Sequence, residues 1–102
     1  MSSILVGNEI STEREEIVRA LEAEGFTVVQ TGSASEATRE IWGGSFIVAV
    51  ISTLLTGTTA QALVGQLAQM APEIETIVQG KNDEIPALVR KVISIRDGSA
   101  AA

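Results

Sequence analysis

Polar residues stand where two apolar runs end, which is the place at which parallel α/β proteins carry their chemistry. The first run is followed by Gly7, Asn8 and Glu9, and a later run rich in valine and isoleucine ends at Ser52. A phosphate-handling α/β domain would carry aspartates at such strand ends, because carboxylates hold magnesium. Since Glu9 is the only acid among these residues, the sequence predicts a domain without that chemistry.

Ser52 is the one candidate nucleophile at these strand ends. A serine nucleophile needs a base, and the chain has no histidine, which leaves a lysine as the formal alternative. We favour a serine that caps a turn. Asn8 with Glu9 could hold a cation, but we favour a solvated loop in which the asparagine tolerates an unusual φ. We therefore expect a protein that is not an enzyme.

Two further segments could bind a ligand. Residues 57–59 could hold an anion at a helix N-terminus, although an ordinary helix cap is favoured. Residues 80–83 lie at the carboxyl edge of the predicted sheet, where open α/β folds bind ligands. A small-ligand site at this edge, with contacts from Thr58, Lys81 and Asn82, remains the alternative.

Two surface features also have competing interpretations. Trp42, near the end of a predicted helix, could anchor an interface, but we favour packing against its own sheet. A run of acids along the first predicted helix is interpreted as a solvated face, helped at its start by the helix dipole. Its members are Glu13, Glu15, Glu16, Glu22 and Glu24.

Composition narrows the classes of function. The formal net charge of −6 disfavours nucleic acid and anionic membranes as partners, because an acidic surface repels phosphate. The lack of cysteine and histidine removes disulfides, thiolate sites and the usual zinc ligands, so no metal or cofactor is expected. No apolar run approaches the roughly 20 residues that span a bilayer. The N-terminus lacks the features of a signal peptide, so we expect a cytoplasmic protein.

Strand and helix signals alternate along the chain. The predicted strands are 4–6, 26–30, 46–51 and 74–78, and each is followed by a helix, the first at 13–24 and the last at 85–95. Capping-box spacing occurs at Thr12 and Glu15 and again at Ser33 and Glu36. Gly25 is expected to end the first helix in a left-handed conformation.

The later helices carry start signals of their own. Thr58 or Thr59 is expected to cap the third helix, and Asn82 or Asp83 the last. Pro86 fits the first turn of that last helix, where its missing N–H costs nothing. Four strand–helix units in 102 residues predict one α/β domain, residues 1–97, with a flexible tail at 98–102.

The order and spacing of four pieces carry a family resemblance. They are ILVGNE, REEIVRALEAEGFTVVQTGSASEA, FIVAVISTLLTG and APEIETIVQG. Across residues 4–78 the chain resembles the receiver domain of bacterial two-component response regulators. The resemblance implies a three-layer, flavodoxin- or CheY-like open parallel sheet, shortened to four strands in the order 2-1-3-4 with four helices. The first and last helices should cover one face and the other two the opposite face, with Leu5, Val6, Val50 and Ile51 in the central core.

The resemblance also implies which receiver residues are replaced. In that family an acid pair after the first strand holds magnesium, the third strand ends in the phosphoacceptor aspartate, and the fourth ends in a Thr or Ser. The matching positions here are Gly7 and Asn8 for the acid pair, Glu9 for an acid that often follows it, Ser52 for the phosphoacceptor, Thr56 for the usual proline and Gln79 for the switch residue.

The end of the chain departs further from the family. A full receiver has another helix and a fifth strand after the fourth, ending in a lysine, and Lys81 cannot be given that role. Deletion of one αβ unit should leave strand 74–78 as a sheet edge with Glu75 as its clear charge. Bare edges invite pairing, so a homodimer is expected, by strand pairing, helix packing or helix exchange.

These observations lead to one expected function and one alternative. The chain is expected to be a non-catalytic, receiver-like signalling module that binds protein. The alternative is a signalling receiver that binds a small effector or a phosphoryl group at the carboxyl edge of the sheet.

Overall fold

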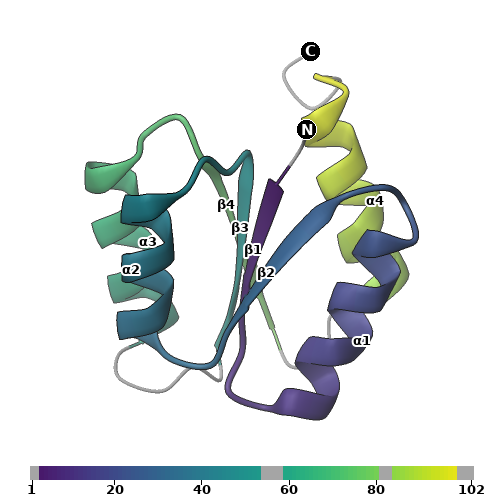
Figure 1. Cartoon of the computed structure of the whole chain (residues 1–102), viewed down its shortest axis with the longest axis horizontal. Coiled ribbons are helices and arrows are strands. Elements are labelled where there is room, and N and C mark those ends of the chain that lie inside the picture. The colour runs from purple at the N-terminus through teal and green to yellow at the C-terminus, as the bar shows by residue number, and fades with distance from the viewer. Residues whose placement is uncertain (1–2, 54–58, 81–83, 99–102) are drawn as a thin grey trace.

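The computed structural model describes residues 3–53, 59–80 and 84–98, and shows four strand–helix units in three layers (Figure 1). The elements are β1 (Ser3–Gly7), α1 (Ser11–Glu22), β2 (Thr27–Thr31), α2 (Ala34–Gly43), β3 (Val48–Ser52), α3 (Ala60–Met70), β4 (Glu75–Gln79) and α4 (Ile85–Arg96). The sheet has the order β2-β1-β3-β4, and all its pairings are parallel. The predicted fold class and strand order are confirmed. None of the described helices is both long and apolar enough to cross a bilayer.

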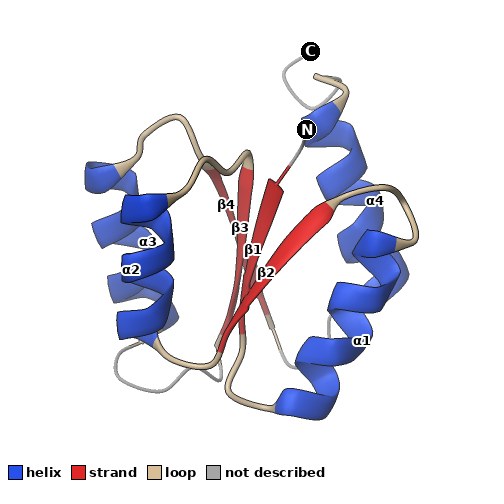
Figure 2. Ribbon diagram, in the orientation of Figure 1, coloured by secondary structure: helices blue, strands red, loops and turns tan. Residues whose placement is uncertain are grey.

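The helices form two layers, one on each face of the sheet (Figure 2). The hydrophobic cluster on one face is built from α1, α4 and alternate residues of the central strands, and that on the other face from α2, α3 and the remaining ones. The predicted placement of the helices is therefore confirmed. This division follows from the strand period of two, because neighbouring residues of β1 and β3 point to opposite faces.

The two central strands supply most of the core. Leu5, Val6, Val50 and Ile51 are all fully buried, as the sequence predicted. Burying an aliphatic side chain of this size stabilises a fold by roughly 1.5–3 kcal/mol. Because aromatic residues are few, valine, isoleucine and leucine supply most of this stabilisation.

Three predicted helix signals are confirmed. Gly25, just after α1, has a φ of +91°, a conformation that glycine adopts without steric cost. The backbone N–H of Glu36 donates to Ser33 Oγ at 3.3 Å, so Ser33 caps α2. Thr59 caps α3 in the same way, because its Oγ1 accepts a hydrogen bond from the N–H of Ala62 at 3.1 Å.

Two predicted caps are wrong. The helix α1 begins at Ser11 with Ile10 as its N-cap, so the Thr12 and Glu15 pair lies inside the first turns and does not form a capping box. The N-cap of α4 is Glu84, whose side chain makes no capping bond, and not Asn82 or Asp83, which lie outside the described residues. Pro86 does occupy the first turn, as predicted.

Candidate functional site

Three polar side chains meet at the carboxyl edge of the sheet. Asn8 follows β1, while Ser52 and Gln79 end β3 and β4, which are neighbours in the sheet. These side chains are 0%, 2% and 4% exposed. Parallel strands that end at one edge bring such residues together, as the sequence analysis expected. Their burial was not expected, and it makes the three residues a buried polar cluster.

Asn8 is held in the cluster by hydrogen bonds from both its side chain and its backbone. Its side-chain Nδ2 donates to Glu13 Oε1 at 3.0 Å, and its Oδ1 accepts from the N–H of Ile10 at 2.8 Å. Its backbone C=O accepts from the Arg14 guanidinium at 2.7 Å, and its N–H donates to the C=O of Thr31 at 3.1 Å. The predicted solvated loop at Asn8 is therefore wrong, and no described residue other than glycine has a positive φ.

Glu13 is the carboxylate that joins the cluster. It lies in the first turn of α1, and its Oε1 accepts from Asn8 and, more distantly, from Gln79 Nε2 at 3.5 Å. Glu13 was predicted to lie on a solvated acidic face, and it is instead half-buried where that face meets the cluster. Its position one turn beyond a strand end was the available signal, since the first turn of such a helix faces the carboxyl edge.

Gln79 is only partly satisfied in its buried position. Its backbone C=O accepts from the N–H of Thr53 at 3.1 Å, which extends the ladder between β3 and β4. Its side-chain Oε1 is buried and has no hydrogen-bond partner among the described residues. Such an acceptor costs roughly 1–3 kcal/mol when it is left unpaired.

Among the described residues, the cluster offers the Glu13 carboxylate and the Ser52 hydroxyl as its groups for metal or nucleophilic chemistry. Magnesium prefers carboxylates in a near-octahedral set, and no group of three or more His, Cys, Asp or Glu side chains suited to a metal occurs in the described part of the chain. The carboxylate at the centre of the cluster, Glu13, already accepts two amide donors. Ser52 is buried, and no histidine exists to activate it.

The other predicted site residues fall into two groups. Glu9 is exposed beside the cluster, and Gly7 is buried at the end of β1. Thr56, Thr58, Lys81 and Asn82 lie outside the described residues, so the ligand edge stays a prediction.

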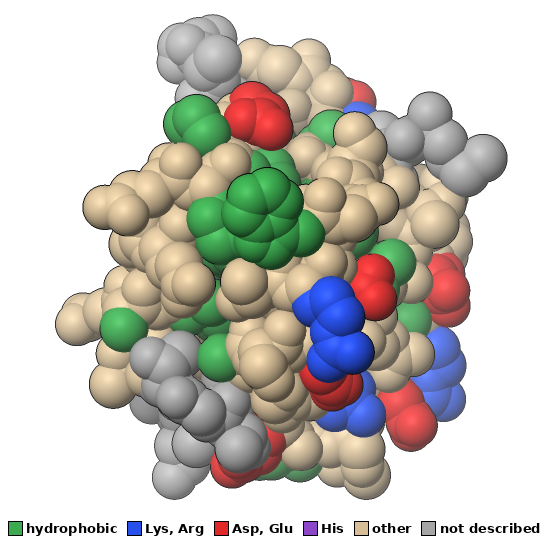
Figure 3. All heavy atoms as spheres, turned by 60° about the vertical axis from the view of Figure 1, so that its left-hand side comes forward, with side chains coloured by type: hydrophobic (Ala, Val, Ile, Leu, Met, Phe, Trp, Pro, Cys, Tyr) green, Lys and Arg blue, Asp and Glu red, His purple; other side chains and the backbone are tan. Residues whose placement is uncertain are grey.

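Trp42 is placed differently from the prediction. It lies in the last turn of α2 and is 77% exposed, so it does not pack against its own sheet. Hydrophobic side chains gather near the centre of the face over α2 and α3 (Figure 3). The alternative interpretation, an interface residue, is thus the one compatible with its exposure.

Comparison with known proteins identifies the fold. No protein-family model matches the chain, and a search of curated proteins found no match. The receiver domain of the Francisella response regulator 1452 superposes with a TM-score of 0.88 at 15% sequence identity, over 97% of this chain and 99% of that one. A CheY-like receiver domain protein from Methanospirillum hungatei JF-1 gives a TM-score of 0.87 at 14% identity, over 100% of this chain and 99% of the other. The chain has the fold of a response regulator receiver domain.

A third similar structure shows this receiver fold beside a partner. The response regulator protein TrrA from Thermotoga maritima, in complex with the histidine kinase ThkA, matches with a TM-score of 0.82 at 16% identity, over 93% of this chain and 98% of that one. The structural match reaches beyond residues 4–78, to which the sequence resemblance was confined. The receiver-like sheet of this chain nevertheless ends at β4, and α4 follows that strand directly in the chain.

Proposed function

We propose that the chain is a non-catalytic, receiver-like signalling module that acts by binding protein and does not accept a phosphoryl group. One observation carries the proposal: the Asn8 amide occupies the position of a receiver acid and donates a hydrogen bond to the nearby carboxylate of Glu13. The NH2 group of this amide is not a magnesium ligand, and its Oδ1, the atom that could bind the ion, already accepts from the N–H of Ile10. The edge of the sheet is thereby closed by internal hydrogen bonds.

The residues around Asn8 support the same conclusion. The position matched to the phosphoacceptor is Ser52, whose buried hydroxyl lacks a histidine base. The position matched to the switch residue is Gln79, whose amide also points toward Glu13. In a receiver of this kind, the hydrogen bonds among Asn8, Glu13 and Gln79 would stabilise one conformation. Its signalling role would then depend on the surface that it offers to other proteins.

Protein is the partner class that fits the chain best. The net charge of −6 opposes binding to nucleic acid or anionic lipid. The related fold of TrrA is seen in complex with a histidine kinase, which supports contact with protein as the mode of action. We propose a cytoplasmic location and, as the first partner, a second copy of the chain.

Phosphorylation is tested by incubation with acetyl phosphate and magnesium, followed by intact-mass measurement. A receiver domain that retains its aspartates serves as the positive control. We expect no added phosphoryl mass on this chain. We also expect the side-chain amide NMR signals of Asn8 and Gln79 to show no saturable shift with millimolar magnesium. An adduct on Ser52, or a tight magnesium site, would contradict the proposal.

One buried atom favours the second candidate function. Gln79 Oε1 lacks a partner among the described residues, so an N–H or O–H group of a small effector could satisfy it. This candidate predicts that an effector shifts the side-chain amide signals of Gln79 and Asn8, and that Gln79→Met abolishes the shift that remains observable at Asn8. The test is an NMR screen of amine- and hydroxyl-bearing metabolites. If none of them shifts these signals, the effector-binding function is ruled out and the protein-binding module remains.

A further inference from the structure

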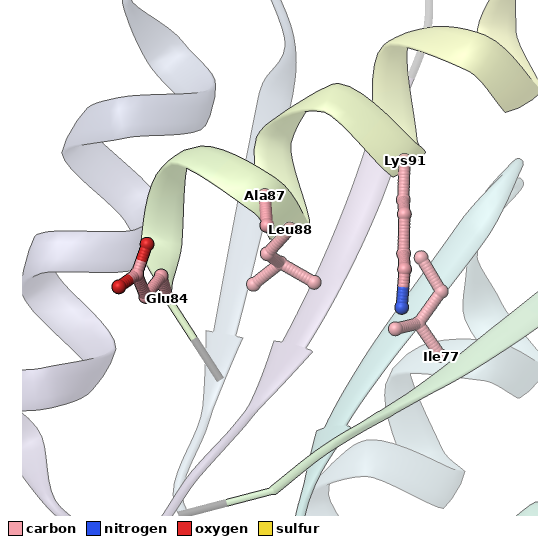
Figure 4. Close-up of a pocket in the computed structure, with 5 residues that line it drawn as sticks. All are labelled: Ile77, Glu84, Ala87, Leu88 and Lys91. Atoms are coloured by element: carbon pink, nitrogen blue, oxygen red, sulfur yellow. The ribbon is translucent and has the colours of Figure 1, made fainter. Parts of the chain in front are cut away.

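The strand β4 is an open edge of the sheet. It comes last in the strand order, and Val78, near its end, is 41% exposed. A groove of about 60 Å³ lies between this strand and α4, lined by Ile77, Glu84, Ala87, Leu88 and Lys91 (Figure 4). An edge strand beside a groove is a template for another strand, because no described strand pairs with its outer backbone groups.

The hydrogen bonds to β3 show which backbone groups of β4 point outward. Glu75 donates its N–H to the C=O of Ile47, and the C=O of Gln79 accepts from the N–H of Thr53, both at 3.1 Å. In a parallel ladder alternate residues direct both groups toward the same neighbour. The odd-numbered residues of β4 therefore bond to β3, while Thr76 and Val78 direct their N–H and C=O groups away from the sheet.

We propose that a second copy of the chain pairs with this edge, β4 against β4 in antiparallel orientation, with Ile77 facing Ile77 across a two-fold axis. The inference rests on the proposed function and names the surface used. In this register Thr76 of each copy lies opposite Val78 of the other, so each such pair exchanges both of its outward hydrogen bonds. A two-fold pair of this kind is closed, and it leaves no β4 edge exposed.

Charges beside Ile77 make this pairing self-complementary. Glu75 and Ile77 share the face of the sheet covered by α1 and α4, because they are two residues apart in a strand. The side chain of Lys91 reaches down from α4 to Ile77 (Figure 4). Neither Glu75 nor Lys91 forms an ion pair with a described residue. Pairing of two copies brings two lysines and two glutamates together around the Ile77 pair.

The contact between Lys91 of one copy and Glu75 of the other favours a second copy over an unrelated peptide. The chain as a whole is acidic, with a net charge of −6, so two copies repel each other elsewhere. Within the groove Lys91 is the positively charged side chain, and the second copy supplies Glu75 as its counter-charge from the same strand that supplies the hydrogen bonds. An unrelated strand would need both a free strand edge and an acidic side chain at the matching position.

The first experiment is sedimentation equilibrium of the wild type and of charge-reversed variants at micromolar to submillimolar concentration. The wild type should shift with concentration from 10.7 kDa toward twice that mass. Lys91→Glu and Glu75→Lys should each raise the dissociation constant by about tenfold, because two like-charge contacts replace two opposite ones. The combination of both reversals should restore the wild-type constant. A wild type that stays monomeric throughout, or single variants that dimerise as tightly as the wild type, would overturn the proposal.

Two single proline variants, one on each edge strand, test whether the dimer forms through the backbone of β4. Val78→Pro removes an outward N–H without removing a bond to β3, and proline is tolerated at such edge positions. Gln30→Pro is the matched control on β2, the other edge, because the bond from Asn8 N–H to the C=O of Thr31 places the Gln30 N–H outward as well. We expect Val78→Pro to be monomeric and Gln30→Pro to dimerise, with folded circular dichroism spectra for both. A dimer that persists in Val78→Pro overturns the pairing through β4.

The outcome is independent of the phosphorylation test. If the chain is monomeric and takes no phosphoryl group, the proposed dimer is rejected and the proposed non-catalytic function is retained. If the chain dimerises through β4 but accepts a phosphoryl group, the proposed non-catalytic function is rejected and the proposed interface is retained.

Discussion

The side-chain amide of Asn8 donates a hydrogen bond to the carboxylate of Glu13 at 3.0 Å, and this contact fixes the start of α1 against the end of β1. The two residues are five positions apart, and between them the Asn8 Oδ1 accepts from the N–H of Ile10. An asparagine can make both contacts because its side chain has a donor and an acceptor. An aspartate at this position would keep the acceptor and lose the donor.

The first prediction follows from that difference. Asn8→Asp places a second carboxylate beside Glu13 in a buried position, and we expect it to lower the free energy of unfolding at pH 7 by at least about 2 kcal/mol. Urea denaturation measures the change. The double variant Asn8→Asp with Glu13→Gln restores a donor–acceptor pair and should recover most of the loss. An Asn8→Asp protein as stable as the wild type would show that the two side chains do not share a buried site.

A second prediction concerns the end of α2. A Cβ added at Gly44 would lie 2.7 Å from Phe46 Cε2, closer than real contacts allow, and 3.0 Å from the backbone oxygen of Glu40, which is tighter than most real contacts. Gly44→Ala should therefore cost about 1–3 kcal/mol through overpacking. Gly43→Ala is the matched control, because a Cβ there meets nothing within 4 Å. It should be neutral or stabilise the helix by up to about 1 kcal/mol. Equal melting temperatures for the two variants would contradict this packing.

The sequence predicted the order of elements well because local signals determined it. Apolar strands, the cap at Ser33 and the left-handed Gly25 each depend on neighbours in the chain, and the structure confirms them. The burial of Asn8 and the role of Glu13 depend on how α1 meets the sheet, which no local pattern shows. Asparagine and glutamate are usually exposed, so the sequence alone favoured a solvated Asn8, which is wrong, and did not indicate the half-buried contact of Glu13.

Trp42 illustrates the opposite error and gives a third prediction. A large aromatic residue is usually well buried, yet Trp42 is 77% exposed in the last turn of α2. We expect its fluorescence emission to resemble that of tryptophan in water and to be quenched readily by acrylamide. Trp42→Ala should change the free energy of unfolding by less than about 0.5 kcal/mol. As a control, Phe46→Ala, at a residue only 8% exposed, should cost about 3–5 kcal/mol. A blue-shifted, quencher-resistant emission would show that Trp42 is covered, for instance at an interface.

The last prediction tests the centre of the sheet. Val50 lies opposite Val6 on one side and Ile77 on the other, and its side chain is fully buried in the cluster beneath α1 and α4. Val50→Asp would bury a charge with no partner at this position, which costs several kcal/mol. A domain of this length has a total stability of only about 5–15 kcal/mol, so most of the protein should be unfolded or insoluble. Gln30→Asp adds the same charge on the exposed edge strand β2, beside the Arg14 guanidinium that already contacts Gln30, and should melt near the wild type. Soluble yield and thermal circular dichroism measure both variants. A Val50→Asp protein that melts with the wild type would mean that β3 is not a central strand, because only an exposed or hydrated position accepts an unpaired carboxylate without loss.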